Sequence, residues 1–156
     1  ALDAKTGTSL DVIKLLLEGA YPAAPKVSFP IVDVRDCAAV HVKAMMVPGA
    51  GGRRLIAADE TLSLPEMGAI LRAGFPEVAK RIPKGSLPDF FVRFLSLFDR
   101  SLKSVTPDLG VVPTVESAYV TELTGVSFRP ADEAVRETAR TLIEYSAVRS
   151  PKRERK

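Results

Sequence analysis

Asp33, Arg35 and Asp36 form the densest cluster of charged side chains that this sequence places near a strand end, where they could take part in chemistry. They stand near the end of a predicted strand, and ligands of α/β sheets bind outside the carboxyl ends of strands. The same residues also have a structural interpretation. Asp36 can accept a hydrogen bond from a free N–H group at a helix start, and Arg35 can pair with either carboxylate. We favour the structural role and name no catalytic residue.

His41 and Cys37 are the single histidine and the single cysteine of the chain. No set of cysteines and carboxylates surrounds His41 at the spacing of metal ligands, so we predict no metal site and a structural histidine. Cys37 has no His–Asp partner pattern and is expected to be a small buried apolar residue rather than a nucleophile. One cysteine excludes an internal disulfide and fits the reducing cytoplasm.

The elements around these residues are predicted to be strand, helix and strand. Residues 29–34 form a short apolar run rich in β-branched side chains, which predicts a buried strand. Apolar residues then recur at helical spacing over residues 38–46, and a glycine-rich turn at residues 49–52 ends that helix. Residues 53–58 offer a second apolar strand. Two parallel strands joined by a helix are typical of an α/β protein with a covered sheet.

The rest of the chain is predicted to be mostly helical. Ser9 or Thr8 can cap the first helix, and Ser63 with Glu66 forms a capping box for another. A short edge strand is expected at Arg81 and Ile82. The expected helices cover residues 10–17, 63–72, 87–98, 117–123 and 131–145, with a short helix or turn over residues 99–109.

At 156 residues and 46% apolar composition, the chain is long enough for one domain with a real core. Its apolar runs are short and interrupted and no leader pattern opens it, so we expect no membrane span and no signal peptide. The net charge is +3, but residues 149–156 alone carry +4 and leave −1 for the remainder. We therefore expect a disordered basic tail, and neither nucleic-acid nor membrane binding.

The run VDVRDCAAVHVKAM, followed by PGAGGRRLIAA, resembles the C-terminal half of an extended short-chain dehydrogenase/reductase. The resemblance is to the dihydroflavonol-4-reductase-like, NAD(P)-dependent epimerase/dehydratase group. It continues through SLPEMGAILR, LPDFFVRFLSLFD and TGVSFRPADEAVRETARTLIE, and so covers about residues 1–145. The resemblance implies an α/β fold, the C-terminal portion of a Rossmann-type reductase: the last strands of its parallel sheet and a mostly helical substrate-binding lobe. This region spans residues 1–148, before the tail.

Two motifs of that family are absent from this sequence. The family binds its dinucleotide at a glycine-rich turn before a helix, and no G-x-G-x-x-G or G-x-x-G-x-x-G occurs here. Its proton donor is a tyrosine in Y-x-x-x-K, whereas Tyr21, Tyr119 and Tyr145 are followed four residues later by proline, leucine and arginine. The resemblance therefore implies that the nucleotide-binding half is missing from this chain.

The resemblance also implies candidate binding residues. Thr8 and Ser9, at a helix start, would contact the dinucleotide, although a role as a helix cap alone is equally open. Phe29 and Pro30 would line the substrate pocket. Phe91 and Phe94 lie on the helix that covers this pocket in relatives, but aromatic residues at helical spacing are more often part of a core.

Two functions follow from these observations. In the first, the parent protein is an NAD(P)-dependent oxidoreductase that acts on a ketone or alcohol, with NADP or NAD as cofactor. This chain then binds the small-molecule substrate, and the missing N-terminal half or a partner chain supplies the catalytic groups. In the second, the chain is a non-enzymatic binding or dimerisation module derived from that family, and a homodimer is possible.

Overall fold

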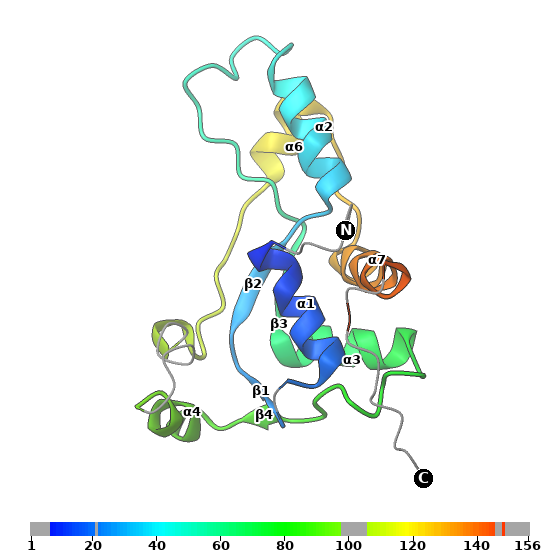
Figure 1. Cartoon of the computed structure of the whole chain (residues 1–156). Coiled ribbons are helices and arrows are strands. Elements are labelled where there is room, and N and C mark those ends of the chain that lie inside the picture. Colours follow the sequence, from blue (N-terminus) through cyan, green and yellow to red (C-terminus); the bar gives the residue numbers. More distant parts are fainter. Residues whose placement is uncertain (1–6, 21, 98–105, 146–147, 149–156) are drawn as a thin grey trace.

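The computed structural model describes residues 7–20, 22–97, 106–145 and 148. Helices predominate, and the strands are short (Figure 1). The predicted tail, residues 149–156, lies outside the described residues. The elements are α1 (Thr8–Glu18), β1 (Ala24–Pro25), β2 (Ser28–Ile31), α2 (Val34–Ala44), β3 (Glu60–Ser63), α3 (Leu64–Gly74), β4 (Ser86–Leu87), α4 (Asp89–Leu95), the 3-10 helix η1 (Thr106–Asp108), α6 (Ala118–Thr124) and α7 (Ala131–Glu144).

The strands pair in two small sheets. β1 and β4 are parallel, whereas β2 and β3 are antiparallel, with Phe29 opposite Leu62. The prediction of a parallel pair formed by residues 29–34 and 53–58 was therefore wrong. Residues 53–58 pair with no strand among the described residues. The strand that pairs with β2 is β3, which follows this segment in the sequence. The edge strand predicted at Arg81 and Ile82 was also wrong, because that segment is a turn.

The main core lies between α1, α3 and α7, which pack around the β2–β3 pair (Figure 1). Each helix contributes a row of buried apolar side chains, as its helical periodicity predicts. The buried members of this cluster are Ile13, Leu16, Leu17, Leu62, Met67, Leu71, Ile82, Ala131, Val135, Ala139 and Leu142.

Helix α1 ends at Gly19, which has a φ of 65°. Its N–H group bonds to the carbonyl of Leu16, and the Ala20 N–H bonds to that of Leu15. A Cβ atom on Gly19 would lie 2.5 Å from the carbonyl oxygen of Arg81. Glycine is therefore required here both by the left-handed backbone and by the close approach of the 75–82 turn.

A smaller cluster anchors α4. Val27, Val92 and Leu109 are buried together, with Leu87 packed against them. Phe29 contacts both this cluster and the main core, so β2 connects the two parts of the interior. The helix predicted over residues 87–98 is shorter in the structure, because α4 ends at Leu95.

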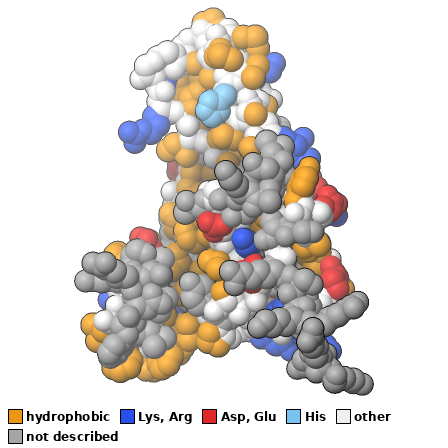
Figure 2. Space-filling model, viewed as in Figure 1, with side chains coloured by type: hydrophobic (Ala, Val, Ile, Leu, Met, Phe, Trp, Pro, Cys, Tyr) orange, Lys and Arg blue, Asp and Glu red, His pale blue; other side chains and the backbone are white. Residues whose placement is uncertain are grey.

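Helices α2 and α6 pack on each other at one end of the molecule (Figure 1). Much of the surface at this end and at the α4 end is hydrophobic (Figure 2). The apolar face predicted for α2 is largely exposed: Val42 is 50%, Met45 79% and Met46 64% accessible. Among the described residues, no helix has both the length and the apolar character needed to cross a bilayer.

Candidate functional site

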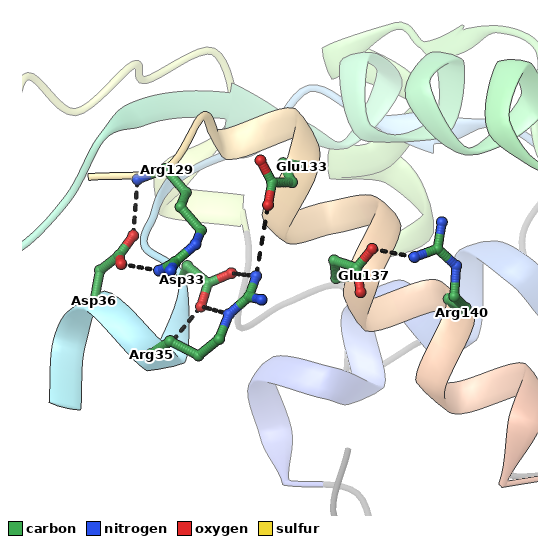
Figure 3. A network of polar contacts seen from close by, with 7 residues as sticks. All are labelled: Asp33, Arg35, Asp36, Arg129, Glu133, Glu137 and Arg140. Atoms are coloured by element: carbon green, nitrogen blue, oxygen red, sulfur yellow. Dashed lines mark hydrogen bonds and ion pairs between the residues drawn. The ribbon is translucent and has the colours of Figure 1, made fainter. Parts of the chain in front are cut away.

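Asp33 stands directly before α2 and is its N-cap. Its Oδ1 accepts hydrogen bonds from the backbone N–H of Arg35 at 2.8 Å and from Nε of Arg35 at 2.9 Å. Nη2 of Arg35 donates to the other oxygen at 2.7 Å (Figure 3). The guanidinium group lowers the pKa of Asp33 from 3.8 to about 2, against the opposing effect of burial. The cap predicted at Asp36 was therefore misplaced, since Asp33 has the extended backbone that a cap requires.

Asp36, in the first turn of α2, is used differently. Its Oδ2 accepts the backbone N–H of Arg129 at 2.7 Å, and its Oδ1 accepts the Arg129 guanidinium (Figure 3). Arg35 also lies 3.6 Å from Glu133 on α7. We call Asp33, Arg35, Asp36, Arg129 and Glu133 the α2–α7 clamp, because they join the starts of these two helices.

Asp59 makes a further hydrogen bond to the start of α7. Its Oδ2 accepts the N–H of Ala131 at 2.8 Å, which satisfies a helix-start donor that the N-cap residue Pro130 leaves without a side-chain partner. Asp33, Asp36 and Asp59 each accept at least one hydrogen bond, whereas Glu133 forms an ion pair with Arg35. These contacts give the group a structural role, because they hold the starts of α2 and α7 together.

Cys37 and His41 face each other one turn apart on α2. Nδ1 of His41 lies 2.7 Å from the carbonyl oxygen of Cys37 and 3.8 Å from its Sγ. Cys37 is only half-buried, so it is not the fully buried residue that we expected. Within the described part of the chain, no cluster of three or more His, Cys, Asp or Glu side chains could hold a metal ion.

Thr8 and Ser9 lie inside the first turn of α1. The N-cap is Gly7, with no side-chain cap hydrogen bond, and its carbonyl accepts the N–H groups of Leu10 and Asp11. The predicted cap at Thr8 or Ser9 was wrong, because helical geometry already begins at Thr8. Ser9 is exposed, so its hydroxyl is open to a ligand. Contact with a dinucleotide stays a prediction.

The four predicted substrate residues lie on β2 and α4. Phe29 is half-buried and Pro30 is exposed on β2. Phe91 and Phe94 are 42% and 57% accessible, whereas Val92 between them is fully buried. The alternative that these two phenylalanines form part of the core does not hold within this chain. Their role at a substrate pocket stays a prediction.

The structure brings only some of these residues near one another. Phe29 and Val92 contact the same buried cluster, so β2 and α4 adjoin. The start of α1, with Thr8 and Ser9, lies away from α4 (Figure 1). As far as the structure describes the chain, the predicted cofactor and substrate residues do not form one enclosed site.

No family model matches this chain. Its sequence is 33% identical over 84 residues to the ketoreductase azaE of Aspergillus niger, a match that covers 54% of this chain and 24% of azaE. It is 28% identical over 90 residues to the candidate NADPH-dependent methylglyoxal reductase GRP2 of Candida albicans, covering 54% of the chain and 26% of that protein. The solved structure of yeast methylglyoxal/isovaleraldehyde reductase Gre2 with NADPH superposes with a TM-score of 0.67 at 20% identity, over 93% of this chain and 38% of that one.

The resemblance to an extended short-chain dehydrogenase/reductase is confirmed. The fold is that of part of a Rossmann-type reductase, and the sequence relatives are reductases. The matches span about a quarter of the curated relatives, and the chain covers less than two fifths of Gre2.

Arg129, Glu133 and Asp59 are residues of this reductase-like chain that the sequence reasoning did not single out. Arg129 is 93 residues from its partner Asp36, and Ala131 is 72 residues from Asp59. The local signal was weak. In SFRPADE, a proline opens an acidic first turn, which marks a helix start but does not indicate what holds it.

Proposed function

We propose that the chain is the substrate-binding part of an NADPH-dependent oxidoreductase that interconverts a ketone and an alcohol, and that it has no catalytic activity alone. The match to the ketoreductase azaE carries this proposal. The Gre2 fold, solved with NADPH bound, supports the cofactor. The single cysteine of this chain, half-buried and free, supports a reducing, cytoplasmic setting.

In this proposal, the chain binds and orients the substrate and the cofactor, while another part of the reductase supplies the catalytic groups. Phe29, Pro30, Phe91 and Phe94 present apolar surface to a small organic substrate. Ser9 presents its hydroxyl to the anionic dinucleotide, and the start of α1 at Thr8 and Ser9 presents backbone N–H groups to it. NADPH supplies the hydride, and the nucleotide-binding part supplies the proton donor that this sequence lacks in the form Y-x-x-x-K.

The direct test compares the natural gene product with the 156-residue chain. NADPH oxidation is followed with a panel of ketones and aldehydes that includes methylglyoxal. We expect turnover by the gene product and none above the buffer blank for the 156-residue chain. Activity of that chain alone, or a gene product that neither binds nor oxidises NADPH, contradicts the proposal.

A substitution at Ser9 tests the cofactor role. Ser9→Ala in the gene product should weaken NADPH binding by up to about tenfold, as expected for one lost hydrogen bond. Because Ser9 is exposed and is not the cap, the melting temperature should hold or rise slightly. Ser127→Ala, at an exposed serine outside α1, is the control. Equal NADPH affinities in wild type and Ser9→Ala remove Ser9 from the cofactor site.

A non-enzymatic binding or dimerisation module is the second candidate. The exposed side chains of α4 favour it: Phe90 is 74% and Leu97, just beyond the helix, 76% accessible. A gene product without NADPH affinity that associates through α4, and loses this association in Phe90→Ala, supports the module over the enzyme.

A further inference from the structure

A short segment between η1 and α6, residues 110–113, is tied at both ends to the region of the β2–β3 pair. At one end, the N–H of Gly110 bonds to the carbonyl of Lys26, just before β2, at 2.8 Å. At the other end, the hydroxyl of Thr61 on β3 donates to the carbonyl of Pro113 at 2.8 Å. Gly110 has a φ of 75°, which lets the chain turn from η1 into this segment. The chain therefore passes beside β2 on its way to α6 (Figure 1).

The Thr61 hydrogen bond places this segment next to a proposed substrate residue. In the register of β2 and β3, Thr61 stands directly opposite Pro30. The side chains of two opposite residues lie on the same face of an antiparallel pair, with Cα atoms about 4.5–5.5 Å apart. The carbonyl of Pro113 therefore bonds to β3 on the face that carries Pro30. The bond spans 52 residues of sequence, so it reflects the fold and not a local turn.

The segment presents an apolar surface to solvent. Val111 is 51% and Val112 67% accessible, and Pro30 is exposed as well. A ligand that covers these side chains gains free energy by removing apolar area from water. The surface suits a small molecule better than a protein, because a protein interface takes roughly 20–30 residues from each side.

We propose that residues 111–113 form one wall of the substrate site, that Val112 favours substrates with an apolar chain, and that Thr61 positions this wall. The inference rests on the proposed function, in which Pro30 contacts the substrate. It adds the class of substrate: a ketone or aldehyde with an aliphatic or aromatic chain rather than a small polar one. Thr61 acts through the carbonyl of Pro113, so it is a positioning residue and not a catalytic one.

The first test is the steady-state kinetics of the natural gene product with NADPH and methyl ketones of increasing chain length. In wild type, kcat/KM should rise by up to about fourfold for each methylene group that reaches the wall. Val112→Ala removes two methyl groups. It should lower kcat/KM for the longest ketones by about threefold or more, and for the shortest by less than about twofold. Val42→Ala, at an exposed valine on α2, is the control.

The second test separates positioning by Thr61 from a purely structural role. Thr61→Val replaces the hydroxyl by a methyl group of similar size and so releases the carbonyl of Pro113. KM for the long ketones should rise about fivefold, with kcat within about twofold of wild type, as expected for one lost hydrogen bond. Thr61→Ser keeps the hydroxyl and should keep the wild-type KM. A purely structural role would lower the melting temperature and leave the KM of the folded enzyme unchanged.

Each outcome decides the inference. Loss of chain-length preference in Val112→Ala, with a higher KM in Thr61→Val but not in Thr61→Ser, supports it. Unchanged kinetics of Val112→Ala with long ketones overturn it, even if Thr61→Val does not fold, and equal KM values in the two Thr61 variants overturn the positioning role. A Val112→Ala variant that changes sedimentation but not KM assigns the segment to a protein interface and also overturns it. A gene product that reduces no carbonyl compound refutes the proposed function, whereas normal turnover without chain-length preference refutes this inference alone.

Discussion

Asp33 shows how one carboxylate can serve two roles at a helix start. It caps α2 through the Arg35 N–H and also binds the Arg35 side chain through both oxygens. It is only 5% accessible, whereas the Arg35 side chain is 51% accessible. The pair is therefore half exposed to water, which limits its contribution to stability.

Replacing Asp33 by asparagine separates these roles. Asparagine caps helices as well as aspartate does but lacks the charge. Asp33→Asn should therefore lower the free energy of unfolding by about 1 kcal/mol at pH 7. The pKa of Asp33 is lowered in the folded state from 3.8 to about 2. Its contribution is thus complete above about pH 4 and is lost as the pH falls towards 2.

Urea unfolding of wild type and Asp33→Asn between pH 7 and pH 2.5 measures this difference. The difference in the free energy of unfolding between wild type and Asp33→Asn should become smaller below pH 4. Asp108→Asn, at an exposed aspartate, should show no comparable difference from wild type at pH 7. If this difference in free energy stays constant from pH 7 to pH 2.5, Asp33 acts through its geometry alone and not through its charge.

At the scale of elements, α4 depends on one side chain. Val92 is fully buried with Val27 and Leu109, whereas Phe90 is 74% accessible. We expect Val92→Ala to cost about 2 kcal/mol, because it removes buried methyl groups. Phe90→Ala should stay within about 0.5 kcal/mol. Denaturant unfolding of both variants checks this, and equal losses would show that the Phe90 ring is covered.

The elements also differ in how far their local sequence specifies them. The capping box of α3 is confirmed, since Ser63 and Glu66 bond to each other's backbone N–H groups. These partners are three residues apart, so local sequence contains the whole interaction. The cap of α1 was misplaced because two adjacent hydroxyl residues fit the same rule, and the helix begins at the first of them.

At the scale of the whole molecule, apolar surface is exposed at both ends (Figure 2). Met45 at the end of α2 and Phe90 on α4 are each more than 70% accessible. Surfaces of this kind mark contacts with other protein, so the isolated 156-residue chain should self-associate and bind a hydrophobic dye.

Sedimentation across a concentration series and dye fluorescence test this expectation. Met45→Ser and Phe90→Ser should each lower dye binding, whereas Leu109→Val, at a buried position, should not. A monodisperse monomer with a sharp thermal transition and no dye signal would show that these surfaces need no partner.

The sequence by itself determined the helices of the core, the capping box and the family resemblance. These depend on helical periodicity, on spacings of three or four residues and on the order of motifs along the chain. It also indicated that residues 53–58 have the composition of a strand. It did not indicate that β2 pairs with β3 rather than with this segment.

Only the tertiary structure decided the pairing of strands and the partners in the α2–α7 clamp. Asp36 and Arg129 are 93 residues apart, and no local pattern records which distant N–H group a carboxylate will meet. A strand likewise needs a neighbour for its hydrogen bonds, and that neighbour is a property of the fold rather than of the strand's own residues. Local hydrogen bonds and periodic faces can be read along the chain, whereas contacts across the chain exist only once the core has brought their elements together.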